Sequence, residues 1–105
     1  MDRDELLTIL DGFLIDVKLS NDKGFLARAN DVYVEEGLGT DTIYFGNYSD
    51  SHIVLRCNEI KNIRFDDLKS SIEIFTKDCG YTVFFDKGKD YHIVVDSLKE
   101  LGFIK

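Results

Sequence analysis

The chain has 105 residues, of which 44% are hydrophobic, and a formal net charge of −7 at pH 7; this suits one folded domain and argues against disorder. The negative charge disfavours direct binding of nucleic acid or anionic lipid, because both are bound through an excess of Lys and Arg. No apolar run is long enough to span a membrane, the start at 1–5 is acidic where a secretory signal is basic, and two cysteines are too few for a disulfide scaffold, so we expect a cytoplasmic protein.

The first four-fifths of the chain predict one short helix followed by strands. Leu6, Leu7 and Leu10 lie at helical spacing behind acidic residues, so we expect a helix over 4–10 that ends at Gly12. The sequence over 21–24, Asn-Asp-Lys-Gly, predicts a hairpin turn, and Asn30 marks a bulge or bend. Alternating and β-branched runs between turn residues predict strands over 13–19, 25–35, 42–48, 52–57, 60–65, 71–76 and 81–85.

The C-terminal segment fits two kinds of element. Residues 91–95 have the propensity of a strand. Against this, a stripe at helical spacing is formed by Tyr91, Val94, Val95, Leu98 and Leu101. Asp90 suits the N-cap of such a helix, and Gly102 suits the position just after its end. We favour a helix over 90–101.

These elements predict a single α+β domain over 1–105 that is mostly β. We expect a strongly bent antiparallel sheet or small barrel of about five to seven strands, with a short N-terminal helix and a C-terminal capping helix. The inward positions of the predicted elements define the expected core: Leu7, Leu10, Ile15, Val17, Phe25, Ile43, Phe45, Val54, Ile60, Ile63, Ile74, Val83, Phe85, Val94, Leu98 and Leu101.

The C-terminal half resembles pleckstrin-homology (PH) and GRAM-like domains. The likeness rests on Ile60 and Ile63, the alternation over 72–76, the turn at Gly80, the aromatic strand over 81–85 and the closing helix. The resemblance implies a membrane-docking or adaptor domain, and the family often binds phosphoinositides through a basic first hairpin turn. Here that turn contains Lys23 beside Asp22, so the resemblance implies a member that binds protein.

The N-terminal half resembles a second family, the Sm-like proteins. Gly12, Ile15, Val17 and Leu19, followed by Asn21 and Gly24, are similar to the first Sm motif, and residues 55–63 are similar to the second. The resemblance implies a small barrel that assembles into an RNA-binding ring. Cys57 stands where the second motif usually has glycine, and Val34 stands near the position of the RNA-contacting asparagine.

The sequence contains no familiar catalytic motif: no glycine-rich nucleotide loop, HExxH, CxxC or GxSxG. The two cysteines and two histidines are spaced too irregularly for a structural zinc site. Adjacent carboxylates such as Asp66 and Asp67 point to opposite faces of a strand. We therefore expect no catalytic residue, no metal site and no cofactor, and we predict that the protein is not an enzyme.

One stretch differs from the rest in charge. Between Arg28 and Arg56 there is no Lys or Arg, while acidic residues alternate with tyrosines. Tyrosine is enriched at protein interfaces, and acidic groups steer association with a basic partner. The alternative is a solvated sheet face with its aromatic residues in the core. We predict a partner-binding surface made of Asp31, Tyr33, Glu35, Glu36, Asp41, Tyr44, Tyr48 and Asp50.

The leading functional hypothesis is a non-catalytic protein-interaction module with a partner that has a basic surface. Small acidic domains without motifs resemble phage or plasmid proteins that block host defence nucleases, anti-CRISPR proteins among them. That resemblance implies an inhibitor whose carboxylates replace nucleic-acid phosphates on its target. The alternatives are an Sm-like oligomeric RNA binder and a PH-like membrane or adaptor domain.

Overall fold

The computed structural model describes residues 3–11, 13–33, 41–46, 52–86 and 89–104. Within them the chain is an α+β domain that is mostly β, which confirms the predicted fold class. Its elements, in chain order, are α1 (Arg3–Leu10), β1 (Leu14–Asn21), β2 (Gly24–Ala29), β3 (Asp31–Tyr33), β4 (Thr42–Gly46), β5 (His52–Arg56), the 3-10 turn η1 (Cys57–Glu59), β6 (Asn62–Asp66), β7 (Ser71–Phe75), β8 (Gly80–Phe85) and α2 (Lys89–Glu100).

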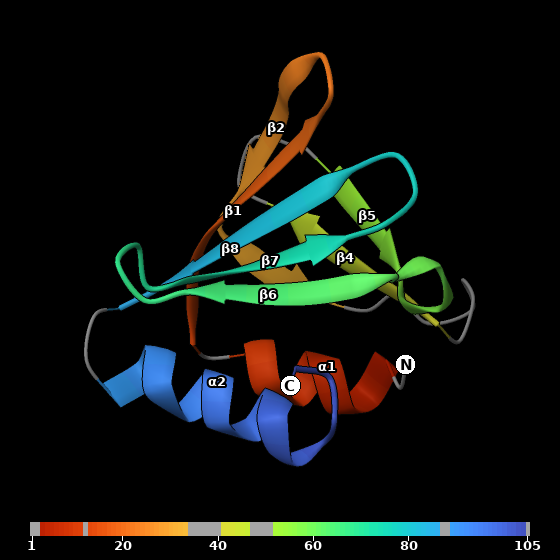
Figure 1. Ribbon diagram of the computed structural model, residues 1–105. Helices are drawn as coiled ribbons and strands as arrows, with labels where there is room; N and C mark the ends of the chain where they lie inside the picture. The colour runs from red at the N-terminus through yellow and green to blue at the C-terminus, as the bar shows by residue number, and fades with distance from the viewer. Residues whose placement is uncertain (1–2, 12, 34–40, 47–51, 87–88, 105) are drawn as a thin grey trace.

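The strands form two antiparallel sheets, one of five strands in the order β2-β1-β8-β7-β6 and one of three in the order β3-β4-β5. The chain passes from the first sheet to the second at Asn30, where the strand predicted over 25–35 divides into β2 and β3. Figure 1 shows the three-stranded sheet behind the five-stranded one, with α1 and α2 side by side below them.

The predicted hairpin over 21–24 is confirmed. Asn21 pairs with Gly24, so Asp22 and Lys23 form a two-residue loop between β1 and β2. The Asn21 Oδ1 atom accepts a hydrogen bond of 2.8 Å from the Lys23 backbone N–H. Gly24 has φ of +116°, a conformation that residues with a Cβ atom rarely adopt, which explains why glycine closes this turn.

Two residues assigned to the core from the sequence lie on the surface of the five-stranded sheet. Ile15 is 50% exposed because a β-bulge between Leu14 and Asp16, opposite β8, makes it the extra residue and breaks the alternation of β1. Phe25 is 58% exposed on the edge strand β2. Its ring lies 5.7 Å from the Lys18 ammonium on the neighbouring strand.

The hydrophobic core lies between the two sheets and the helices. Most of the predicted core residues are buried in it, while Leu7 and Ile60 are partly buried against it. The prediction that Val54 and Leu101 belong to the core was wrong, since their exposed fractions are 42% and 43%. Val54 alternates with two buried neighbours on β5. Leu101 follows the last residue of α2, and its N–H still donates to the Ser97 carbonyl oxygen at 3.1 Å.

The C-terminal segment is a helix, α2, as favoured from the stripe of apolar residues. It begins at Lys89, one residue earlier than predicted, so Asp90 lies in the first turn. At its end the Gly102 N–H donates to the Lys99 carbonyl oxygen at 3.1 Å, and the Phe103 N–H donates to the Leu98 carbonyl oxygen at 2.8 Å. Gly102 has φ of +80°, which completes a Schellman motif and confirms the predicted helix end.

Candidate functional site

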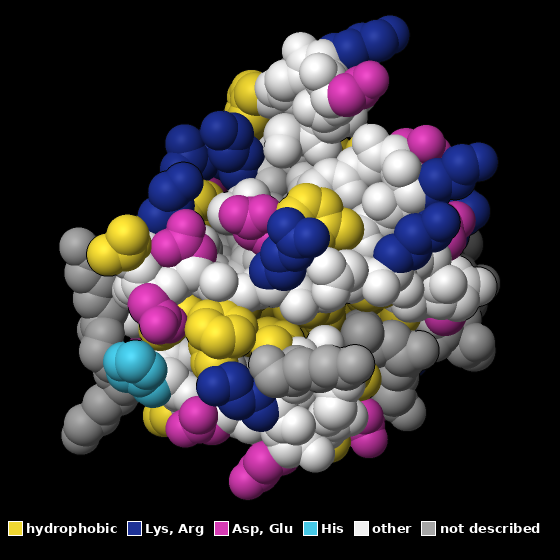
Figure 2. Space-filling model, in the orientation of Figure 1, with side chains coloured by type: hydrophobic (Ala, Val, Ile, Leu, Met, Phe, Trp, Pro, Cys, Tyr) yellow, Lys and Arg dark blue, Asp and Glu magenta, His cyan; other side chains and the backbone are white. Residues whose placement is uncertain are grey.

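Charge is divided unevenly between the five-stranded sheet and the rest of the chain. The sheet and the connections within it, residues 14–29 and 61–85, contain seven Lys or Arg and six Asp or Glu, whereas the rest contains six Lys or Arg and fourteen Asp or Glu. Figure 2 shows basic and acidic side chains intermixed over the face of β6, β7 and β8. The excess negative charge of the protein therefore belongs to the segments outside this sheet.

The register of the three-stranded sheet aligns a row of three residues, one from each strand. Tyr33 on β3 pairs with Tyr44 on β4, and Tyr44 pairs with Val54 on β5. The side chains of Tyr44 and Val54, which are directly paired in antiparallel strands, project to the same face. Tyr44 is half-buried and Val54 is exposed, while their neighbours along the strands are buried. Tyr44 and Val54 therefore lie on the outward side of a sheet whose inner side enters the core.

Two carboxylates lie at opposite ends of β4. Asp31 pairs with Gly46 at the end of β4, and Asp41 immediately precedes its first residue, Thr42. Five residues of strand separate the two ends, roughly 17 Å. By strand alternation Asp31 is in phase with Tyr44, whereas Asp41 is in phase with the buried Ile43 and Phe45. We name the positions Asp31, Tyr33, Tyr44 and Val54 the tyrosine-row surface, and Asp41 lies at its edge.

Local hydrogen bonds orient both of these carboxylates. Oδ1 of the exposed Asp31 accepts a bond of 2.8 Å from the Val32 backbone N–H. Oδ1 of the half-buried Asp41 accepts a bond of 3.4 Å from the Thr42 hydroxyl. The second oxygen of each group is not used in these bonds, so both carboxylates retain acceptor capacity for a partner.

The predicted site residues divide into two groups. Asp31, Tyr33, Asp41 and Tyr44 lie on β3, β4 or the residue before β4, so the structure brings them to one sheet. Glu35, Glu36, Tyr48 and Asp50 lie outside the described residues. Sequence reasoning placed Val54 in the core, although the polar residues two positions to either side of it, His52 and Arg56, indicate that it is the outward member of the run Ile53-Val54-Leu55.

The titratable pair at the end of β6 has structural roles. Asp66 Oδ1 accepts hydrogen bonds from the backbone N–H groups of Leu68 at 3.0 Å and Lys69 at 3.3 Å, which shapes the turn into β7. Asp67 Oδ1 accepts a bond of 2.7 Å from the Tyr91 hydroxyl on α2. These contacts hold the turn and the helix in place and orient neither carboxylate toward a shared ligand.

The described residues contain no group of three or more His, Cys, Asp and Glu side chains arranged to hold a metal ion. Neither cysteine is in a disulfide: Cys57 is buried in η1, and Cys79 is half-buried in the turn between β7 and β8. A small buried thiol such as Cys57 is ordinary core material.

No family model matches the chain, and neither the curated proteins nor the solved structures yield a match. Among the described residues, neither helix combines the length and apolar character that crossing a membrane requires.

Proposed function

We propose that the protein is a non-catalytic protein-interaction module whose partner presents a surface rich in Lys and Arg. The observation that supports this most directly is the position of the excess negative charge outside the five-stranded sheet. A basic partner approaching the rest of the molecule gains long-range attraction, which raises the rate of association and selects against acidic partners.

The tyrosine-row surface is the docking face in this proposal. Tyr44 supplies aromatic contact area of the kind enriched at interfaces, and exposed Val54 extends it across β5. Asp31 and Asp41 at the two ends of β4 supply the acceptors that Lys or Arg side chains need. An apolar centre flanked by charged groups is the usual layout of a protein interface.

In its most specific form the proposal is an inhibitor. A target that binds nucleic acid exposes Lys and Arg positioned for phosphates, and a small acidic domain that presents carboxylates to them competes with the natural ligand. This mode of action suits a phage or plasmid protein that blocks a host defence nuclease.

The experiment is a pull-down of the tagged protein from host lysate, with and without nuclease, followed by binding measurements on the recovered partner. We expect to recover one partner protein in a stoichiometric amount, whether or not nuclease is added. Its affinity should fall as the salt concentration rises from about 50 to about 300 mM. Recovery of RNA that nuclease removes together with its proteins would contradict the proposal and favour an Sm-like RNA binder.

Paired charge reversals test the docking face. Asp31→Lys with Asp41→Lys should weaken binding of the recovered partner by about tenfold or more, because two attractive contacts become repulsive. The matched control, Asp22→Lys with Asp78→Lys, makes the same change in net charge at two exposed turns of the five-stranded sheet. Equal losses from both pairs would mean that overall charge, and not this surface, determines binding.

A further inference from the structure

The two helices enclose a groove that the tyrosine-row surface does not include. α1 and α2 pack against each other beneath the sheets (Figure 1), and a groove of about 420 Å³ lies between them. Its uncharged lining consists of Thr8 and Ile9 from α1, and Ser97 and Leu101 from α2 and the residue that follows it. Ile9 is almost fully buried and Leu101 is 43% exposed, so an apolar base is open to solvent on one side.

The side of α2 that borders the groove has a second exposed apolar residue. Ile93 is 47% exposed and stands four residues before Ser97, while Leu101 stands four residues after it. Residues spaced four apart lie on one face of a helix, so this face presents Ile93, Ser97 and Leu101 over roughly 12 Å of helix axis. Clustered exposed apolar side chains beside a groove are typical of an interaction site.

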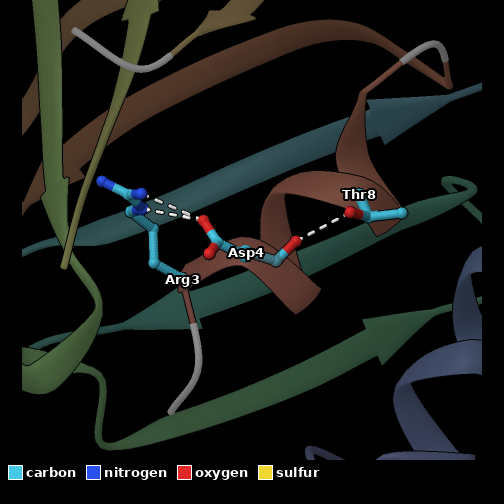
Figure 3. Close-up of polar contacts among 3 residues, drawn as sticks. All are labelled: Arg3, Asp4 and Thr8. Carbon is cyan, nitrogen blue, oxygen red and sulfur yellow. Dashed lines mark hydrogen bonds and ion pairs between the residues drawn. The ribbon is translucent and has the colours of Figure 1, made fainter. Parts of the chain in front are cut away.

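All of the charged residues that line the groove are acidic: Asp4, Glu5 and Glu100. Figure 3 shows Arg3 next to Asp4, with its side chain directed away from Thr8. Two of its guanidinium nitrogens lie 3.0 and 3.1 Å from Asp4 Oδ1. The Thr8 hydroxyl donates to the Asp4 carbonyl oxygen at 2.8 Å, within α1. The three carboxylates outnumber the neighbouring Arg3, so the formal charge of the groove is negative over the residues that the structure describes.

The nearest basic residue of α2 is engaged on another side of the helix. The Lys99 ammonium lies 5.0 Å from the centroid of the Phe65 ring on β6. It therefore packs toward the sheet and does not offset the charge of Glu100 in the groove.

We propose that this groove binds an amphipathic helix of a partner protein, with leucine-like side chains on its apolar face and Lys or Arg beside them. The apolar side chains would cover Ile9, Leu101 and Ile93, and the basic ones would meet the acidic lining. A second copy of this chain is disfavoured as the occupant, because α1 and α2 each contain more Asp and Glu than Lys and Arg. The groove extends the proposed function to a second, separate surface.

The probe is a synthetic helix-forming peptide of about fourteen residues with leucines at i, i+3, i+4 and i+7 and lysines at the remaining positions. Two comparison peptides separate the contributions: a scrambled sequence of the same composition, and a version with glutamate in place of lysine. Binding to the full chain is measured by fluorescence anisotropy, and the site is mapped by shifts of backbone amide resonances.

We expect the amphipathic lysine peptide to bind at least about tenfold more tightly than either comparison peptide, with the largest shifts at Thr8, Ile9, Ser97 and Leu101. The double variant Thr8→Arg with Leu101→Arg should lower its affinity by about tenfold or more. Asp96→Arg is the matched control: it makes the same change in net charge at an exposed position of α2 outside the groove lining. The control should lower affinity by less than about threefold.

Two results would overturn the inference: equal binding of the scrambled peptide, or wild-type affinity in the Thr8→Arg, Leu101→Arg variant. The Asp31→Lys, Asp41→Lys variant should bind the peptide as the wild type does. The groove and the tyrosine-row surface are therefore tested independently, and either can fail alone.

Discussion

Tyr81 on β8 and Val54 on β5 are joined by a hydrogen bond of 2.7 Å, in which the tyrosine hydroxyl donates to the Val54 carbonyl oxygen. The bond connects the five-stranded sheet to the three-stranded one. The Tyr81 ring also lies near the Phe45 ring, with centroids 6.5 Å apart. Because Val54 belongs to the tyrosine-row surface, this bond fixes the position of that surface relative to the core.

Tyr81→Phe should therefore lower the stability of the domain. The substitution keeps the ring but removes the donor and leaves the Val54 carbonyl oxygen without it, at a cost of about 1–3 kcal/mol. Chemical denaturation followed by circular dichroism measures the change. A loss below about 0.5 kcal/mol would show that the bond contributes little to the joining of the two sheets.

Stability should fall at alkaline pH, between about 10 and 12. Burial, followed by the charges of Cys79 and Glu59, raises the pKa of Tyr81 to about 12 from its ordinary 10.0. Burial, followed by the hydrogen bond to Asp67, also raises the pKa of Tyr91. Above pH 10 the unfolded chain ionises these phenols while the folded chain does not, so the stabilisation present below pH 10 is lost as pH rises through the folded pKa.

The check is a comparison of unfolding free energy at pH 9 and pH 11 for the wild type and for Tyr81→Phe. The wild type should lose more stability over this interval, because the variant has no phenol at position 81 to ionise. Lysines titrate in the same range in both proteins, so only the difference between the two proteins is informative. Parallel pH curves would contradict the prediction.

The local parts of the fold could be predicted because their signals are local. The turn at Asn21 to Gly24, the apolar stripe of α2 and the glycine after it each depend on residues within one or two turns of chain. The misplaced core residues depend on pairing between distant segments. Ile15 is displaced by a bulge that exists only opposite β8. Val54 is the exception, because His52 and Arg56, two positions to either side of it, already indicate that it faces outward.

The candidate surfaces also contain parts that local sequence signals predict and parts that depend on pairing between distant segments. The absence of Lys and Arg between Arg28 and Arg56 was evident in the sequence, and it led to Asp31, Tyr33, Asp41 and Tyr44. The row that aligns Val54 with the two tyrosines required the strand register. The groove between α1 and α2 could not be predicted, because it joins residues more than eighty positions apart in the chain.

Leu98 and Leu101 provide a matched pair at the end of α2. Leu98 is fully buried and Leu101 is 43% exposed. Leu98→Ala should cost about 2–5 kcal/mol because it leaves a cavity in the core, whereas Leu101→Ala should change stability by about 0.5 kcal/mol or less. Both are measured by denaturant unfolding. Similar effects in the two variants would mean that α2 is not packed as described.

Ser71 is a site where a substitution should raise stability. Its side chain is fully buried on β7, and its hydroxyl has no hydrogen-bond partner within the part of the chain that the structure describes. Its neighbours across the strands are Asp66 and Phe84. A buried hydroxyl without a partner forfeits its hydration, so Ser71→Ala should increase the free energy of unfolding by about 1 kcal/mol. Ser97→Ala, at a half-buried position of α2, is the control and should have a smaller effect. A loss of stability in Ser71→Ala would mean that the hydroxyl does make a stabilising bond in solution.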